Sequence, residues 1–557
     1  MEATVPQWTE RFTNTDVVGE DHLGVEGVAQ SYQQYLVPGI ISTTDHARYY
    51  SFYCWILYRY INQPDSPRTL AGYRGKFFKR HELAFLIGCY SHHKDRNYLG
   101  GLVGSGVGNF KARRIWDSSD PITTLDDHLD YFGHSQGGFG QYYRPVMQAM
   151  GLVVEPESPR WIYRLTHRGE ALAQAFAETI SGTMYSEQLD NQGEVTSITH
   201  DMATEYGQRA CLCPEVMTQS ADREPLLDAF FRFDQEGLGN PHTRRRLTLA
   251  FILDLVSQTE GVALRPTLRR ALYLGWFSEG IPYQPQTSLK DWYQRWRMTQ
   301  VRHMYTATLQ TLWAVFLDHL HGVEQISFEA FLEHVCGFLP NDVASLPLSD
   351  YLTGLCAPLS LDGDWKMATN QFHAACQTET SLDEMTLFAA IEVAGRETAV
   401  LVPYALQILC QLFLRHYPLR QNNDPIWQEV AQVERLPLEQ FMQDLARYAE
   451  EGRSVGDWLA WLYRIYCLGQ HEIIALQKLR YNKYNTFKFY YQDDRFTWAN
   501  NPVNYQVPLR FPGLRLFNGL TILADLGLVK EDEEGFCIFT ADGETFLARS
   551  VMVNHAT

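Results

Sequence analysis

Two distant stretches of the sequence repeat one pattern, and this repeat is the feature that most restricts the fold. Residues 146–172 read VMQAMGLVVEPESPRWIYRLTHRGEAL, and residues 520–546 read LTILADLGLVKEDEEGFCIFTADGETF. In each stretch an apolar helical pattern ends at Gly-Leu-Val, where glycine can adopt the left-handed conformation that terminates a helix. A short apolar segment, a polar turn and an alternating segment follow. The repeat therefore predicts a helix and a β-hairpin in both places.

Each alternating segment ends at a threonine that is placed to cap another helix. These residues are Thr166 and Thr540, and each begins the sequence Thr-x-x-Gly-Glu. Helix, strand, turn, strand and helix is the second half of a winged helix. The pattern resembles that of bacterial regulators whose recognition helix closes with LGLV and whose wing ends in LTxxGE. We therefore predict two winged-helix-like modules.

The remainder of the chain has a helical pattern. Apolar residues recur at spacings of three and four, for example in residues 298–320, and the hydrophobic content of 45% is ample for several packed cores. We predict a mainly α, multi-domain helical protein with two winged-helix-like (α+β) modules. The expected order is an N-terminal helical domain (1–120), the first winged-helix-like module (121–180), a polar linker (181–201), a helical domain (202–475), a basic aromatic connector (476–505) and a C-terminal winged-helix-like module (506–557).

Charge and cysteine usage restrict the compartment and the class of function. The net charge of −18 argues against a surface built for nonspecific nucleic-acid binding. The ten cysteines are scattered through apolar runs, as expected for reduced thiols in the cytoplasm. The N-terminal residues do not have the pattern of a signal peptide. The apolar stretch 399–414 is short for a bilayer and contains Pro403, so we expect a cytoplasmic protein without a membrane segment.

The first repeat carries the side chains that best suit contact with nucleic acid. In a winged helix the recognition helix enters the major groove and the wing touches the backbone. The second wing is acidic, with Glu531, Asp532, Glu533 and Glu534 in a row, so we expect it to pack against protein. The candidate residues of the first copy are Gln141, Tyr142, Tyr143, Arg144 and Gln148 on the helix and Arg160, Trp161 and Arg164 on the wing.

A second candidate for nucleic-acid binding is the strip of residues 476–505. Its cations alternate with tyrosine and phenylalanine, a composition that suits phosphate contact together with base stacking. The alternative is a connection whose aromatic rings pack in the protein while its cations face water. The cations of this strip are Lys478, Arg480, Lys483 and Lys488.

Catalytic and cofactor motifs are incomplete throughout the sequence. The glycine-rich loop 104–109 lacks the Lys-Ser/Thr of a nucleotide-triphosphate loop. The thiols of Cys211 and Cys213 are too close in sequence for an ordinary zinc knuckle, and no second Cys/His pair stands at a useful spacing. His92 and His93 begin a nuclease-like pattern that the following residues do not complete. We therefore expect no enzyme activity, no cofactor and no metal.

The segment Tyr35–Ile61 reads YLVPGIISTTDHARYYSFYCWILYRYI, in which an apolar-Pro-Gly turn is followed by an Arg-Tyr-aromatic helix rich in Phe, Tyr and Trp. On this pattern it resembles the opening of uncharacterised bacterial proteins found in antiphage defence islands. The resemblance implies an accessory subunit that acts beside an ATPase or a nuclease of the same operon. His46 stands where relatives are expected to carry Arg or Thr. Arg48 and Arg59 lie on an aromatic helix, so each must find a carboxylate or lie across a ring face. The matching residues are Pro38, Gly39, Thr43, Ala47, Arg48, Tyr49, Phe52, Trp55 and Ile56.

These observations lead to one leading functional hypothesis and three alternatives. The leading hypothesis is a non-enzymatic adaptor or regulatory subunit of a prokaryotic antiphage defence system, acting through protein interfaces with limited DNA contact. One alternative is a winged-helix transcriptional regulator. Another is a kleisin-like partner of a chromosome-maintenance-type ATPase, or an accessory protein of a CRISPR-linked module that is cut on signalling. The last is a cryptic nuclease built around His92, His93 and Asp95.

Overall fold

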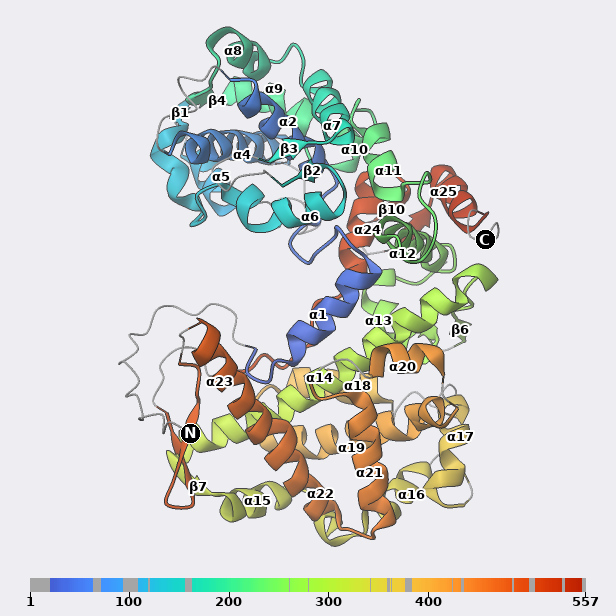
Figure 1. Cartoon of the computed structure of the whole chain (residues 1–557). Helices are drawn as coiled ribbons and strands as arrows, with labels where there is room; N and C mark the ends of the chain where they lie inside the picture. The colour runs from blue at the N-terminus through green and yellow to red at the C-terminus, as the bar shows by residue number, and fades with distance from the viewer. Residues whose placement is uncertain are drawn as a thin grey trace, which may run out of the picture. The chain divides into compact units, whose positions relative to one another are not determined.

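The computed structural model divides into two compact units, each assembled from three segments of the sequence (Figure 1). Unit 1 comprises residues 1–32, 269–282 and 294–512, and unit 2 comprises residues 33–268, 283–293 and 513–557. The predicted domains, in contrast, were consecutive segments. The structure describes residues 21–63, 72–93, 109–118, 121–155, 163–259, 261–278, 280–340, 342–357, 361, 363–375, 383–422, 424–431, 435–482, 485–499, 506–532 and 536–552.

The first segment of unit 2 is a layer of helices around the aromatic helix α2. This helix packs against α7, and α4 packs against α9. Its elements are α2 (Arg48–Ile61), α4 (Tyr73–His93), α5 (Asn109–Asp117), β1 (Ile122–Thr124), η1 (Leu125–Tyr131), η2 (Phe139–Tyr143), α6 (Arg144–Ala149), β2 (Val153–Val154), β3 (Arg164–Leu165), α7 (His167–Thr179), α8 (Met184–Gln192), β4 (Ser197–Thr199), α9 (His200–Ala210), α10 (Pro214–Met217), α11 (Arg223–Phe231) and α12 (Pro241–Val256).

The last segment of unit 2 completes it around α12. Helix α12 packs against α24, β11 and α25, and it is buried along almost its whole length. The additional elements are η3 (Thr287–Leu289), α24 (Leu516–Asp525), β10 (Val529–Glu531), β11 (Cys537–Phe539) and α25 (Ala541–Met552). Three further helices have residues in both units: α1 (Val25–Leu36), α13 (Leu264–Leu274) and α14 (Lys290–Val323).

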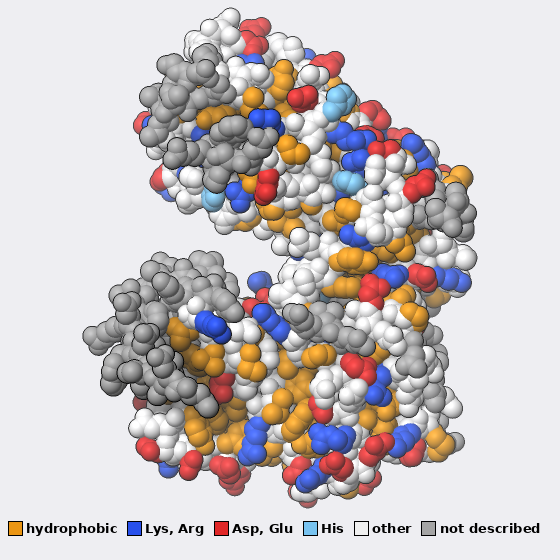
Figure 2. All heavy atoms as spheres, viewed as in Figure 1, with side chains coloured by type: hydrophobic (Ala, Val, Ile, Leu, Met, Phe, Trp, Pro, Cys, Tyr) orange, Lys and Arg blue, Asp and Glu red, His pale blue; other side chains and the backbone are white. Residues whose placement is uncertain are grey.

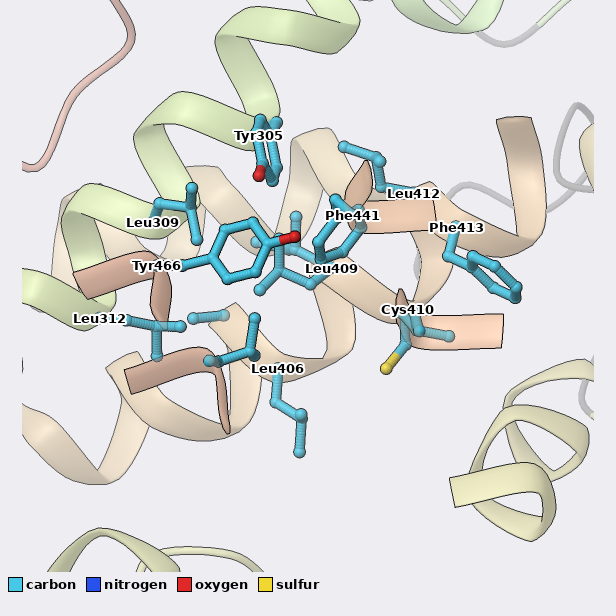
Figure 3. Close-up of a cluster of buried hydrophobic side chains, with 14 of the residues drawn as sticks. Tyr305, Leu309, Leu312, Leu406, Leu409, Cys410, Leu412, Phe413, Phe441 and Tyr466 are labelled. Atoms are coloured by element: carbon cyan, nitrogen blue, oxygen red, sulfur yellow. The ribbon is translucent and has the colours of Figure 1, made fainter. Parts of the chain in front are cut away.

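Unit 1 is a helical body whose core is formed by α14, α19 and α21. Figure 3 shows Tyr305, Leu309 and Leu312 of α14 beside Leu406 and Leu409 of α19. A three-stranded antiparallel sheet of order β7-β9-β8 flanks the helices. The elements are β5 (Trp276–Ser278), β6 (Ile281–Pro282), β7 (Gln325–Ser327), α15 (Phe328–Cys336), η4 (Val343–Ser345), α16 (Leu348–Cys356), α17 (Trp365–Ala375), α18 (Glu384–Ala394), α19 (Thr398–Gln421), α20 (Pro425–Ala431), α21 (Leu438–Glu450), α22 (Val455–Trp461), η6 (Leu462–Gly469), α23 (Gln470–Asn482), β8 (Phe489–Gln492) and β9 (Arg495–Trp498).

Helix α19 is the one described helix that is long and apolar enough to cross a bilayer. Within its most apolar window 67% of the residues are buried inside the protein, and α17, α18 and α21 pack around it. A mostly buried apolar helix of this kind is typical of the core of a soluble protein. Pro403 and Pro418 interrupt its hydrogen bonds from within.

The described residues confirm a mainly helical protein with short strands. Two segments that looked like connections are nevertheless regular structure. The predicted linker 181–201 contains α8, which Thr183 caps, and β4, which pairs with β1. The predicted connector 476–505 contains the hairpin of β8 and β9, which pairs with β7. The sequence did not indicate these elements because both segments are polar. In addition, β4 and β9 pair with strands that are distant in the sequence.

Candidate nucleic-acid interface

Both copies of the sequence repeat end their first helix in the same way. Gly151 and Gly527 have positive φ angles of 69° and 75°, and each follows the last turn of a helix. The amide of the next residue donates to a carbonyl five residues earlier, from Leu152 to Met147 and from Leu528 to Leu523, at 2.9 Å in both copies. This bond defines the Schellman termination that the Gly-Leu-Val pattern predicted.

The two threonines cap the following helix with matching contacts. The Thr166 hydroxyl donates to the Gly151 carbonyl at 2.8 Å, and it accepts from the Gly169 amide at 3.2 Å. The Thr540 hydroxyl makes the equivalent bonds to the Gly527 carbonyl at 3.0 Å and from the Gly543 amide at 3.1 Å. The threonine therefore ties the end of one helix to the start of the next.

Glycine is required at the third position of each capped helix. A Cβ atom on Gly169 would lie 2.2 Å from the Leu152 carbonyl oxygen, and one on Gly543 would lie 2.2 Å from the Leu528 oxygen. Because the obstacle is backbone in both copies, it cannot rotate away. The glycine of the Gly-Glu element is therefore explained by the close approach of the helix to the backbone at the start of the hairpin.

Antiparallel hairpins join the helices in both copies. Val153 pairs with Leu165 between β2 and β3, and Val529 pairs with Phe539 between β10 and β11. The predicted hairpins are therefore present, and each copy is a helix–hairpin–helix. Strand β1 belongs to neither hairpin, because it pairs with β4.

The helix of the first copy has an open face. Tyr143, Val146, Met147 and Met150 are buried, whereas Gln141 and Pro145 are exposed and Tyr142, Arg144 and Gln148 are half-buried. Elements η2 and α6 together cover 11 residues, or about 16 Å at 1.5 Å per residue. The face that carries the predicted contacts Gln141, Tyr142, Arg144 and Gln148 is therefore accessible, and the predicted Tyr143 is not.

Buried Glu82 positions the beginning of this helix. Its carboxylate accepts from the amides of Gly138 at 3.1 Å and Phe139 at 3.2 Å, and from the Tyr131 hydroxyl at 2.6 Å. A negative group is favourable at the amino end of a helix. Burial raises the pKa of Glu82 even though these hydrogen bonds oppose the shift. A Cβ on Gly137, whose φ is +58°, would meet this carboxylate at 2.1 Å.

Cations adjoin the open face. The Arg144 guanidinium lies 5.6 Å from the centre of the Tyr163 ring, next to the exposed Arg164 of β3. Burial lowers the pKa of His134, and the nearby charges of Arg144 and Lys79 lower it further. A pocket of about 560 Å³ adjoins Lys79 and is also lined by Arg74, Lys76, Asp126 and Gln136. Asp126 is already engaged by Arg80 through two hydrogen bonds.

The helix of the second copy has no comparable face, because each residue of α24 is buried or half-buried. The Asp525 carboxylate accepts from the His46 ring at 3.1 Å and from the Ala47 amide at 2.9 Å. Glu531 of β10 accepts two hydrogen bonds from Arg265, at 2.6 and 2.8 Å. The second copy thus packs against other parts of unit 2.

No family model, curated protein or solved structure matches this chain. The candidate interface therefore rests on the geometry of the chain alone. Figure 2 shows Lys and Arg side chains interspersed with Asp and Glu among the described residues in that view, in keeping with the net charge of −18. Because the chain as a whole is acidic, the positive charge beside the helix of residues 139–149 is local.

Part of the predicted cationic strip is not accessible at the surface. Lys488 is fully buried, and its amide donates to His471 at 3.1 Å, so its charge does not reach a phosphate at the surface. Lys478 donates to the Asp21 carbonyl at 2.8 Å, while Arg480 is exposed on α23. The predicted contacts Lys483, Arg160 and Trp161 lie outside the described residues.

Arginines elsewhere in unit 2 serve the fold. Arg245 and Arg246 are fully buried and donate to the carbonyls that end α11, including Ala229 at 2.8 Å and Arg232 at 2.7 Å. Orphan carbonyls at a helix end require such donors. The charges of these two arginines are therefore enclosed in the protein and add nothing to a positive surface.

One group of potential metal ligands was not predicted from the sequence. His92 and His93 lie beside Cys213, with their ligand atoms within 4.8 Å of one another. The pair of histidines and the Cys-x-Cys segment are about 120 residues apart, so no spacing rule could connect them. The glycine-rich loop and Asp95, which the nuclease hypothesis required, lie outside the described residues.

Proposed function

We propose that this chain is a non-enzymatic adaptor of a prokaryotic antiphage defence system, and that it contacts double-stranded DNA through its first helix–hairpin–helix. The observation that carries the DNA contact is the difference between the two copies. They share their capping bonds, yet only the helix of residues 139–149 presents polar and cationic side chains to solvent, whereas α24 is enclosed. An exposed recognition helix beside a hairpin is the arrangement by which winged helices enter the major groove.

The assignment of both copies as winged helices is part of this proposal. Helix α2 packs against α7 and β3, and α12 packs in the same way against α25 and β11. We therefore take α2 as the first helix of one winged helix and α12 as the first helix of the other. In the second copy Ala263 also bridges Phe536 in antiparallel fashion, in the place of the third strand.

An adaptor is favoured over a sequence-specific regulator because a single open helix reads few base pairs. Helix-turn-helix regulators commonly present two such helices one turn of DNA apart, through a symmetric dimer. Here the second copy within the chain cannot supply the partner helix. The resemblance of Tyr35–Ile61 to defence-island proteins provides the biological setting, with an ATPase or nuclease of the same operon as the expected partner.

The DNA contact is tested by measuring affinity for a duplex of several turns over a range of salt concentrations. Each phosphate contact contributes a slope of about −0.9 in log K against log salt. We expect Arg144→Ala to weaken binding and to reduce the magnitude of this slope by about 1. Lys530→Ala is the matched control, because Lys530 is an exposed cation at the equivalent hairpin of the second copy.

Equal losses in the two variants would attribute binding to general charge and would contradict the assigned interface. Circular dichroism should show that both variants keep the helical content of the parent chain. The absence of any binding at low salt would refute the DNA contact altogether.

The adaptor role is tested separately by co-expression with the neighbouring genes. We expect the chain to purify in a complex with an ATPase or nuclease subunit, and this complex to survive Arg144→Ala. A chain that purifies alone and ignores every neighbour would remove the adaptor proposal, whatever the outcome with DNA.

A further inference from the structure

Two glycines bring the ends of α4 and α9 together. A Cβ atom on Gly207 would lie 2.0 Å from the Gly88 carbonyl oxygen, and one on Gly88 would lie 3.2 Å from the Gly207 amide. The hydroxyl of Ser91 also donates to the Ala203 carbonyl at 3.2 Å. Because the backbones touch at this crossing, the residues about one turn further along both helices meet.

Those residues are soft metal ligands. His92 and His93 end α4, and Cys211 and Cys213 follow directly after α9. The ligand atoms of His92, His93 and Cys213 lie within 4.8 Å of one another, and His93 Nε2 lies 3.1 Å from Cys211 Sγ. Cys213 and Cys89, which is one turn before His93, both act on the Cys211 thiol and therefore lie near it.

We propose that His92, His93, Cys211 and Cys213 form a structural zinc site that joins the end of α4 to the segment after α9. The site goes beyond the proposed DNA contact and does not depend on it. It also differs from the sequence expectation that the chain holds no metal.

The donor set and its geometry favour Zn²⁺ over a hard cation. Two thiolates and two imidazoles make a Cys₂His₂ set, whereas Mg²⁺ and Ca²⁺ prefer oxygen ligands. Tetrahedral zinc with bonds of about 2.0–2.3 Å places its ligand atoms about 3.3–3.8 Å apart. His93 Nε2 and Cys211 Sγ, 3.1 Å apart, are slightly closer than this, and the ligand atoms of His92, His93 and Cys213 lie within 4.8 Å of one another. Rotations of the side chains would have to bring all four ligand atoms onto one tetrahedron.

Charge and protons balance on binding. Cysteine binds Zn²⁺ as the thiolate, and histidine binds it as the neutral imidazole. Zn²⁺ therefore displaces one proton from each thiol and binds two neutral imidazoles. The products are a neutral Zn(Cys)₂(His)₂ group and two released protons.

Burial indicates a structural role. Cys211, Cys213 and His93 are 1%, 0% and 4% exposed, which leaves no open position for a substrate. His92 is half-buried and provides the side from which the ion enters. The carbonyl of Cys211 also accepts from the buried Arg48 at 2.6 Å, so the segment that would carry the thiolates is fixed from behind.

The experiment begins with the full chain, reduced, freed of metal with a chelator and desalted. Cobalt is added as a spectroscopic probe, followed by zinc. We expect one equivalent of Co²⁺ to produce the visible bands of tetrahedral cobalt and a thiolate charge-transfer band, and one equivalent of Zn²⁺ to abolish both. Mass spectrometry of the intact protein in native conditions should show a single bound zinc.

Cys213→Ser and His93→Gln should reduce zinc to a background level, at least tenfold below the parent chain. The control is Cys336→Ser, which changes a half-buried thiol of unit 1 that lies outside this cluster. If a site variant fails to fold, titration of the parent with a thiol-specific mercurial still decides the matter. Zinc release should then follow the modification of two thiols.

A folded parent chain that takes up neither cobalt nor zinc overturns the site. A mass lower by two hydrogens with a Cys89–Cys211 disulfide under reducing purification would also overturn it. Uptake that persists unchanged in both Cys213→Ser and His93→Gln would place the metal elsewhere and would have the same consequence.

Discussion

Arg48 lies in the most aromatic helix of unit 2, and its guanidinium is completely enclosed. It donates to the Asp222 carboxylate at 3.0 Å and to the Cys211 carbonyl at 2.6 Å. The sequence required a carboxylate or a ring face for this residue, and the carboxylate is confirmed. Arg59, on the same helix, meets Asp190 at 2.7 Å near the surface.

The two arginines should differ strongly in their effect on stability. Arg48→Met leaves the Asp222 charge buried and unpaired, so we expect a loss of about 3–5 kcal/mol in the free energy of unfolding. Arg59→Met breaks an exposed pair and should cost about 0–1 kcal/mol. Urea denaturation followed by tryptophan fluorescence measures both. Similar losses in the two variants would contradict the burial that distinguishes the pairs.

His46 should make stability depend on pH. Burial alone would lower its pKa, but the charge of Asp525 and the hydrogen bond to it prevail, and the pKa is raised above 6.5. Asp45 raises it further and Arg265 opposes this. A raised pKa means that the contribution is fully present below about pH 6.5 and is lost as pH rises through the folded-state value.

We therefore expect the urea midpoint of the parent chain to fall between pH 6 and the weakly alkaline range. His46→Gln should be less stable at pH 6 and should lack this part of the fall. An unchanged pH dependence in His46→Gln would show that the pair with Asp525 is not charged. Asp525→Asn is the complementary variant, because it removes the anion and leaves the imidazole.

At the scale of elements, the same residues that defined the repeat also limit substitution. Gly169→Ala and Gly543→Ala each force a methyl group against a carbonyl oxygen, so we expect a loss of about 1–3 kcal/mol per variant. Gly354→Ala in α16 is the control, since a methyl group there would meet no atom within 4 Å outside the backbone of its own helix, and it should gain about 0.4–1 kcal/mol. Thermal unfolding of the three variants provides the comparison.

The repeat could be predicted because its signals are local. Gly151 and Thr166 act on neighbouring carbonyls and amides, so glycine, threonine and strand alternation record the backbone directly. The acidic wing predicted that the second copy packs against protein, but its partners His46 and Arg265 could not be predicted, because they are hundreds of residues away in sequence. The burial of Lys488 was missed for the same reason. The cluster of His92 with Cys213 depends on the crossing at Gly88, which no spacing rule describes.

At the scale of the whole molecule, the order of the chain differs from the order of its units. Unit 2 takes its last segment from residues 513–557, after the chain has formed most of unit 1. The C-terminal repeat is therefore part of unit 2. Its apolar helix α24 and strand β11 pack against α12, which is buried along almost its whole length.

Removal of residues 513–557 should therefore unfold more than the segment that is lost. It takes away the partners of α12, the Asp525 carboxylate that binds His46 and the Glu531 carboxylate that binds Arg265. We expect hydrogen exchange to lose protection throughout α2 and α12, while α19 in the core of unit 1 remains protected. A chain that ends at residue 552 retains every described element and is the control. If α12 kept its protection without residues 513–557, the C-terminal repeat would be an independent domain, as the consecutive division of the sequence implied, and unit 2 would be complete without it.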